Sequence, residues 1–241
     1  MPVALQPTPA AKASPVEPAG QPLENGDHLT AREFLRRYEA MPRVKKAELI
    51  EGIVYMGSPV RVAQHAETHI LVQTWLGTYA ARTPGTESAS SPTNRLDIDN
   101  VPQPDALLRL LPECGGRSRV DAEDYLEGPA ELVVEIAASS ASLDWNAKLL
   151  VYRRSGVLEY LVWRTMENKF DWLLLEDEDY RPNPPDAQGL MHSRTFPGLT
   201  LDVAALLALD AGRVLDTLEA SLRTPAHEAF VARLKAAGKL P

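Results

Sequence analysis

Two carboxylates and a lysine are the residues of this sequence whose types and order most clearly suggest chemistry. Asp105 follows a proline, Glu135 lies in the apolar run 132–136, and Lys148 comes 13 residues after Glu135. Carboxylates that meet at strand ends can bind Mg²⁺, which prefers oxygen ligands and takes one or two carboxylates from a protein. A nearby ammonium can orient or activate a water against a phosphate ester. The three residue types therefore fit metal-assisted phosphodiester hydrolysis.

Each of these residues also has a plainer interpretation. Asp105 after Pro104 fits a turn, where Asp makes local hydrogen bonds. Lys148 lies four residues after Asp144, the spacing of a surface ion pair that adds little stability. Glu135 is harder to explain in this way, because a carboxylate inside an apolar strand is costly to bury unless it is paired or bound to a metal. The spacing alone leaves these alternatives open.

His65 and His69 stand four residues apart, so on a helix they share a face, as zinc ligands can. In the metalloprotease pattern a glutamate directly follows the first histidine. Here Glu67 is two positions on, rotated by about 200° from His65 on helical geometry. No third ligand is evident nearby, which disfavours a zinc hydrolase. We expect His65 to line a polar cleft or to contact the start of its helix.

Composition and charge limit the function classes. The chain has 241 residues and a net charge of -8, with a pI of about 5.2, which argues against broad, sequence-independent binding of nucleic acid but allows a local basic groove. Its single cysteine, Cys114, can form no internal disulfide, so we expect a reducing, cytoplasmic setting. No stretch has the length of a membrane span or the pattern of a secretory signal, and we expect no membrane partner. No Gly-rich phosphate loop suggests ATP or NAD.

Glu48 and the basic residues before it have two interpretations each. Glu48 could be a solvated strand residue or a partner of Lys45 or Lys46. The basic cluster could be a solvated face or a contact to a phosphate backbone. Its members are Arg32, Arg36, Arg37, Arg43, Lys45 and Lys46.

The elements that must position these residues alternate between helix and strand. Thr30 and Glu33 have the spacing of a capping box at the start of a helix over 31–40. The other expected elements are a strand pair over 49–56 bent at 51–52, a helix over 63–81, strands at 95–98, 105–110 and 131–137, a helix over 144–155 ended by Gly156, strands at 157–163 and 169–175, a loop over 111–128, a Pro-rich break over 181–188 and a short helix over 202–209.

This order predicts an α/β fold with a mixed central sheet flanked by helices, an N-terminal hairpin and a C-terminal helical extension. We expect a disordered Pro-rich tail over 1–26, one domain over 27–210 and the extension over 211–241. Five aromatic residues are expected in the core, namely Trp145, Tyr160, Trp163, Phe170 and Trp172.

Taken together, these stretches resemble the Uma2 (DUF820) family of restriction-endonuclease-like proteins, which belongs to the PD-(D/E)XK nuclease superfamily. The resemblance covers roughly residues 28–210. The matching stretches are 47–52, the helix start at 64–65, 104–105, 132–136, 144–152, 156–163 and the Phe-Pro-Gly-Leu segment at 196–199.

The resemblance implies a Mg²⁺- or Mn²⁺-dependent nuclease acting on DNA. By resemblance, Asp105 and Glu135 would bind the metal, and Lys148 would supply the lysine of the motif, moved from the strand to the following helix because Ala137 stands two residues after Glu135. Glu48 and His65 match polar positions that the family places around the same cleft. The sequence departs from the family at Ala138, where a serine-containing motif is usual, and at Gln103, where many members carry a basic residue.

Two other functions remain open. The chain could be a catalytically inactive relative that keeps the fold as a module for binding nucleic acid or protein, as the acidic charge and the departures suggest. It could also be a dimeric scaffold, because Val214, Leu215, Leu218 and Leu222 form an apolar stripe at helical spacing. A homodimer would also suit a nuclease that cuts both strands.

Overall fold

The structure, a computed structural model, describes residues 21–57, 67–137 and 143–239, with the side chains of 143–145 outside the description. His65, Ala138 and residues 1–20 of the expected tail therefore lie outside the described residues. Of the rest of that tail, Leu23 is buried and Gly26 donates its main-chain N–H to the carbonyl of Val54. Leu23 packs with the N-terminal helix and hairpin.

The predicted mixed central sheet is confirmed, with six strands in the order β11-β10-β9-β8-β5-β3. Strands β8 and β9 run parallel, and the other neighbours are antiparallel. The strand bounds are β3 (Thr86–Ser90), β5 (Ala106–Leu110), β8 (Leu132–Ala137), β9 (Glu159–Arg164), β10 (Lys169–Glu176) and β11 (Asp179–Pro182).

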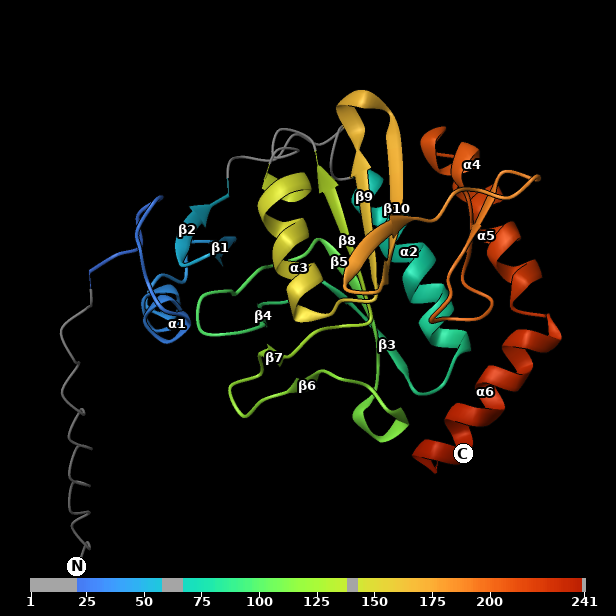
Figure 1. Cartoon of the computed structure of the whole chain (residues 1–241), viewed down its shortest axis with the longest axis horizontal. Coiled ribbons are helices and arrows are strands. Elements are labelled where there is room, and N and C mark those ends of the chain that lie inside the picture. The colour runs from blue at the N-terminus through green and yellow to red at the C-terminus, as the bar shows by residue number, and fades with distance from the viewer. Residues whose placement is uncertain (1–20, 58–66, 138–142, 240–241) are drawn as a thin grey trace, which may run out of the picture.

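Helices cover the sheet on both faces (Figure 1). Helix α2 (Glu67–Arg82) lies on one face and packs its aromatic residues into a cluster with the C-terminal helices. On the other face, the turn η3 (Leu143–Lys148) and the helix α3 (Leu149–Ser155) bring Tyr152 into a second cluster. The apolar run 132–136 faces both layers, which is why it contains almost no polar residue. Among the described helices, none combines the length and apolar character needed to cross a membrane.

A small N-terminal unit lies beside the α3 face of the sheet and consists of α1 (Ala31–Glu39), β1 (Ala47–Ile50) and β2 (Ile53–Met56) (Figure 1). Leu49 exchanges both main-chain hydrogen bonds with Val101, at 3.1 and 2.8 Å. The segment 101–104 is thereby joined to β1. This pairing places the hairpin next to the segment that leads into Asp105.

Several elements differ from the sequence predictions. The capping box is wrong, because Thr30 makes no side-chain cap bond and Glu33 instead pairs with Arg36 and Arg37. Strand β3 was not predicted, since its residues are polar and lie at the edge of the sheet, and β11 starts before the Pro-rich break. Short strands also occur at β4 (Asn94–Arg95), β6 (Arg119–Val120), β7 (Leu126–Glu127), β12 (Leu190–His192) and β13 (Thr200–Asp202), with single 3₁₀ turns η2 (Pro112–Cys114) and η4 (Thr165–Glu167).

The predicted helix over 144–155 is present but begins with a π-helical turn, and Gly156 ends it in a left-handed conformation, as expected. Tyr160, Trp163, Phe170 and Trp172 are buried, which confirms the predicted aromatic core. The side chain of Trp145 lies outside the described residues.

The C-terminal extension forms two helices, α5 (Ala211–Ser221) and α6 (Pro225–Gly238), after the short helix α4 (Val203–Leu207). Val214 and Leu218 are fully buried in the cluster around α2. The apolar stripe that suggested a dimeric scaffold is thus largely covered within the chain.

The Phe-Pro-Gly-Leu segment forms the turn on which α6 docks. Gly198 has a φ of 88°, and a Cβ there would lie 2.9 Å from the Cβ of His227. The imidazole of His227 is buried, and its Nε2 lies 2.9 Å from the Oγ1 of Thr83. The turn therefore needs a glycine for both its backbone conformation and its packing.

We expect Gly198→Ala to lower the free energy of unfolding by about 2–3 kcal/mol, from backbone strain plus overpacking. Gly189→Ala is the matched control, because Gly189 has a φ of 81° and no atom lies within 4 Å of the place that a Cβ would take. The control should cost about 1 kcal/mol, from the backbone conformation alone. Urea denaturation measures both; equal losses would show that contact with His227 does not matter.

Stability should fall at alkaline pH because burial raises the pKa of the Tyr180 phenol well above its ordinary value. A raised folded-state pKa gives stability that is complete below the unfolded pKa, about 10, and is lost as pH rises above it. Between about pH 9 and pH 11, the free energy of unfolding of Tyr180→Phe should therefore fall by about 1 kcal/mol less than that of the wild type. The variant also loses the hydrogen bond from the Tyr180 hydroxyl to the carbonyl of Val157. That loss lowers the free energy of unfolding equally across this pH range, so it does not change the pH dependence. Urea denaturation across this pH range tests it, and equal pH-dependent losses would contradict it.

Candidate functional site

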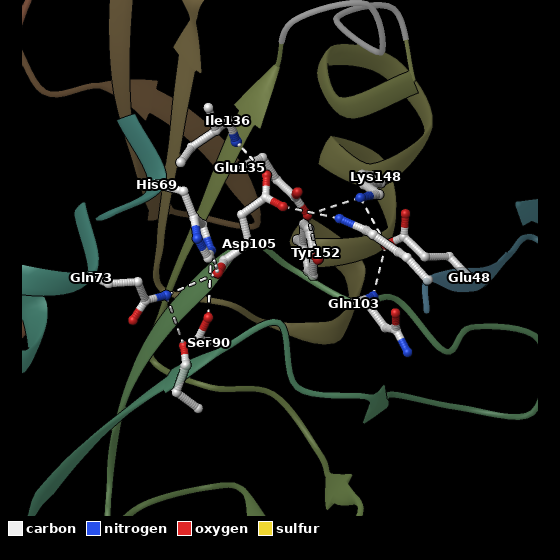
Figure 2. A network of polar contacts seen from close by, with 12 residues as sticks. Glu48, His69, Gln73, Ser90, Gln103, Asp105, Glu135, Ile136, Lys148 and Tyr152 are labelled. Atoms are coloured by element: carbon white, nitrogen blue, oxygen red, sulfur yellow. Dashed lines mark hydrogen bonds and ion pairs between the residues drawn. The ribbon is translucent and has the colours of Figure 1, made fainter. Parts of the chain in front are cut away.

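Asp105 and Glu135 lie side by side at the junction of two central strands (Figure 2). Asp105 immediately precedes β5, and Ala106 pairs with Val134 of β8, so the next positions bring the two carboxylates together. Oδ2 of Asp105 accepts a hydrogen bond from the main-chain N–H of Ile136 at 2.8 Å. Both side chains are buried. Asp105 is therefore held by the sheet rather than exposed in a turn.

Lys148 reaches this junction from the end of the π-helical turn η3. Its Nζ lies 3.1 Å from Oε1 of Glu135 and 2.8 Å from Oε1 of Glu48. The Lys148 side chain is only 2% exposed, so the interpretation of a solvated surface lysine is wrong. Any pairing with Asp144 lies outside the description, because that side chain is not described. A buried ammonium shared by two buried carboxylates is expected to be costly to disrupt.

Glu48 comes from β1 of the N-terminal hairpin, far from the sheet in sequence. Its Oε1 accepts a hydrogen bond from the main-chain N–H of Gln103 at 2.7 Å and also contacts Lys148. The side-chain amide of Gln103 in turn donates through Nε2 to the hydroxyls of Tyr38 and Thr93, at 3.1 and 2.8 Å. Glu48 is 6% exposed, so it is not a solvated strand residue. The hairpin thus closes one side of the site.

The sequence suggested Lys46 as a member of a basic cluster or as a partner of Glu48, whereas its Nζ lies 3.0 Å from Oδ1 of Asp105. Burial disfavours its charge and by itself lowers the pKa of Lys46. The carboxylates of Asp105, Glu48 and Glu135 outweigh that effect, so the pKa of Lys46 is raised above its ordinary value. Lys46 therefore remains charged throughout the physiological range. The suggested pairing of Glu48 with Lys45 or Lys46 is replaced by pairing with Lys148.

Tyr152, one turn after Lys148 on α3, was also not predicted as a site residue. Its hydroxyl donates to Oε1 of Glu135 at 2.9 Å, the same oxygen that Lys148 contacts. Burial, followed by the charges of Glu135 and Glu48, raises the pKa of Tyr152 well above its ordinary value. The phenol is therefore a permanent hydrogen-bond donor. The helical spacing of Lys148 and Tyr152 was the signal that could have found it.

Helix α2 supports Asp105 from the other side. His69 Nε2 and Gln73 Nε2 lie 2.8 and 2.9 Å from the main-chain carbonyl oxygen of Asp105. A carbonyl only accepts hydrogen bonds, so Nε2 of His69 carries the proton. The Oγ of Ser90 lies 3.5 Å from the same nitrogen. His69 was not predicted as a site residue, whereas the predicted His65 lies outside the described residues.

The described residues of the site include three carboxylates and two ammonium groups within one connected network (Figure 2). The carboxylates are Glu48, Asp105 and Glu135, and the ammonium groups are Lys46 and Lys148. In the part of the chain that the structure describes, no group of three or more His, Cys, Asp or Glu residues takes an arrangement that could hold a metal ion. The zinc site considered for His65 and His69 is not tested by this result, because His65 lies outside the described residues.

The arrangement nevertheless has the donor chemistry of a magnesium site. Asp105 and Glu135 supply hard oxygen ligands, and both are fixed by neighbouring strands. The ammonium groups of Lys46 and Lys148 already contact these carboxylates. A divalent ion would have to share the carboxylates with the lysines or displace one of them.

Comparisons with known proteins bear on the family and the fold. The family described as "Uma2: Putative restriction endonuclease" matches residues 31–204. No curated protein matches the chain. Among solved structures, the chain is similar to a "putative nuclease belonging to DUF820" from Anabaena variabilis ATCC 29413. The TM-score is 0.53 at 14% identity, over 68% of this chain and 90% of that one, which shows a shared fold. Because the family match covers most of the sequence and includes every described site residue, this chain belongs to the Uma2 family.

Proposed function

We propose that this protein is a Mg²⁺- or Mn²⁺-dependent endonuclease that hydrolyses phosphodiester bonds in DNA. The observation that carries the proposal is the buried junction of Asp105, Glu135 and Lys148 on adjacent strands and the following helix. Membership of a family described as restriction-endonuclease-like supports the reaction class. The fold shared with a DUF820 protein supports the same superfamily architecture.

In this proposal Asp105 and Glu135 are the metal ligands. A bound divalent cation supplies Lewis acidity there, which activates a water and offsets charge on the phosphate oxygens. The residues fit this role because their oxygens are fixed and lie in a site that already stabilises positive charge. Asp105 is held through its Oδ2 and its main-chain carbonyl, so its Oδ1 side is where a cation would approach.

The remaining residues act on the water and the phosphate. Lys148 orients the attacking water or stabilises negative charge on the phosphate, as a positioned ammonium can. Glu48 and Tyr152 hold Lys148 and Glu135 in place through Oε1 contacts. His65 is proposed to line the cleft, as the family resemblance implies. The exposed residues Arg43 and Lys45 lie near Lys46 in sequence and would face a nucleic-acid backbone.

The test combines metal binding with cleavage. Mn²⁺ is titrated by calorimetry into the wild type and into the Asp105→Asn/Glu135→Gln double variant, and both are assayed on linear, single-stranded and branched DNA. We expect the wild type to bind and cut, and the double variant to lose cleavage by about 10³-fold or more together with metal binding. The isosteric amides preserve shape and remove charge.

Asp186→Asn is the control, because Asp186 lies in an exposed loop and pairs with His192. It should bind Mn²⁺ and cut like the wild type. If the double variant retained full metal-dependent cleavage, Asp105 and Glu135 would not be the ligands.

A second candidate is a non-catalytic module that binds nucleic acid or protein. The saturation of the carboxylates by lysines favours it, as does the lack of a metal-type cluster among the described residues. Normal DNA binding by a wild type that has no affinity for Mn²⁺ would support this candidate. Binding of Mn²⁺ at Asp105 and Glu135 would count against it.

A further inference from the structure

Two of the described groups that contact the carboxylate of Asp105 differ greatly in mobility. Its Oδ2 accepts from the main-chain N–H of Ile136, which belongs to a central strand. Its Oδ1 contacts the ammonium of Lys46 at 3.0 Å. Lys46 carries that ammonium on a flexible stem of four carbons, and its side chain is 33% exposed. Lys46 is thus the contact of Asp105 that can leave without unfolding the sheet.

The second lysine has the opposite character. Lys148 is almost completely buried and is shared between Glu48 and Glu135. Moving its ammonium would leave two buried carboxylates without that partner. If a further cation enters the site, Lys46 is therefore the lysine whose ammonium moves away.

Charge gives the reason why one must yield. Among the described residues, the three carboxylates and two ammonium groups of the site leave a formal charge of about -1, as expected for an ion network that nearly neutralises itself. The charge of Lys148 already opposes that of Lys46. A divalent ion at Asp105 and Glu135 would add two more positive charges within a few ångströms, in a site where solvent screens weakly.

We propose that Lys46 is a displaceable counter-cation, whose ammonium holds Asp105 in the metal-free protein and leaves Oδ1 when a divalent cation binds. This inference rests on the proposed function, because it takes Asp105 as a metal ligand. Once released, the ammonium of Lys46 extends the exposed basic stretch that includes Arg43 and Lys45. Metal binding is in this way coupled to the positive charge offered to a phosphate backbone.

The test is calorimetric titration of Mn²⁺ into the wild type, Lys46→Met, Lys46→Arg and Lys45→Met. Lys46→Met removes the competing charge and should bind Mn²⁺ about tenfold more tightly than the wild type. Lys46→Arg keeps the charge and should bind no more tightly than the wild type. Lys45→Met is the matched control, since Lys45 is the adjacent, exposed lysine, and its affinity should stay within about twofold.

Thermal unfolding gives a readout that does not depend on cleavage. Without metal, Lys46→Met should unfold at a lower temperature than Lys45→Met, because Asp105 loses a partner. Saturating Mn²⁺ should raise its midpoint by more than it raises that of the wild type.

The outcomes separate this inference from the proposed function. A wild type that binds Mn²⁺ and a folded Lys46→Met variant that binds it no more tightly would overturn the inference and leave the proposed function intact. Binding by Lys46→Met alone would support displacement. An absence of binding in all four proteins would overturn both. If Lys46→Met did not fold, tighter binding by Lys46→Arg than by the wild type would still overturn the inference.

Discussion

Glu135→Ala is expected to lower the free energy of unfolding of the metal-free protein by about 3–5 kcal/mol, the range for breaking a buried ion pair by removing one partner. The mutation deprives two buried donors of their acceptor, because Oε1 of Glu135 contacts both Lys148 and Tyr152. Lys148 would remain buried and charged. Of the described carboxylates that contact it, Glu48 alone would then be left to compensate this charge. Urea denaturation at neutral pH in a metal chelator measures the loss.

A double-mutant cycle shows whether the loss comes from the pair. Lys148→Met has a similar length without the charge, and the double variant Glu135→Ala/Lys148→Met should lose less than the sum of the single losses, by about 1–3 kcal/mol. Additive losses would mean that the contact between Glu135 and Lys148 contributes little coupling.

Glu127→Ala is a suitable control for this cycle. Glu127 has two described side-chain donors as well, Arg95 and Arg119, but its side chain is 34% exposed. Glu127→Ala should lower the free energy of unfolding by less than about 1 kcal/mol, because solvent screens an exposed ion pair and competes for its partners. The contrast compares a buried carboxylate with an exposed one, each with two described side-chain hydrogen-bond donors.

The sequence predicted the local elements of the site well. The run 132–136 is apolar on both sides of Glu135, which is typical of a central strand, and β8 occupies that position. The sequence also predicted that Gly156 ends the helix over 144–155, and Gly156 takes the left-handed conformation at the end of α3. Both signals are local, since they depend on residues within one or two turns or strands.

The contacts across the site were not predictable in the same way. Lys46 and Asp105 are separated by 59 positions, and they meet only because Leu49 pairs with Val101 and docks the hairpin. No periodicity in the sequence encodes that docking. Lys46 therefore resembled any other member of an exposed basic cluster, and the structure was needed to distinguish it from its neighbour Lys45.

Strand β3 illustrates a different limit. Thr86–Ser90 is polar, without the apolar alternation that marks a strand, because it forms the outer edge of the sheet. An edge strand needs few apolar side chains and gains stability from pairing with β5. Ser90, at its end, reaches the histidine that supports Asp105, so this unpredicted strand also completes the site.

Lys148→Met should separate the role of the lysine from that of the metal ligands. At saturating Mn²⁺, we expect cleavage to fall by about 10²–10³-fold, the cost of removing one group that stabilises developing charge. Metal binding should persist, because Asp105 and Glu135 are unchanged and a competing positive charge is gone. Calorimetry and single-turnover cleavage on the same preparation measure the two effects.

Lys169→Met is the control for this prediction, since Lys169 is an exposed lysine on β10 whose side chain is 63% exposed. It should cut DNA at the wild-type rate. Full cleavage by a folded Lys148→Met variant would reduce Lys148 to a structural partner of Glu48 and Glu135. Loss of both cleavage and metal binding would instead mean that the buried ammonium is needed to hold the carboxylates in place. Only loss of cleavage with retained Mn²⁺ affinity agrees with a lysine that acts on the water or the phosphate, because an interaction made in the transition state affects the rate without affecting the binding of the ion.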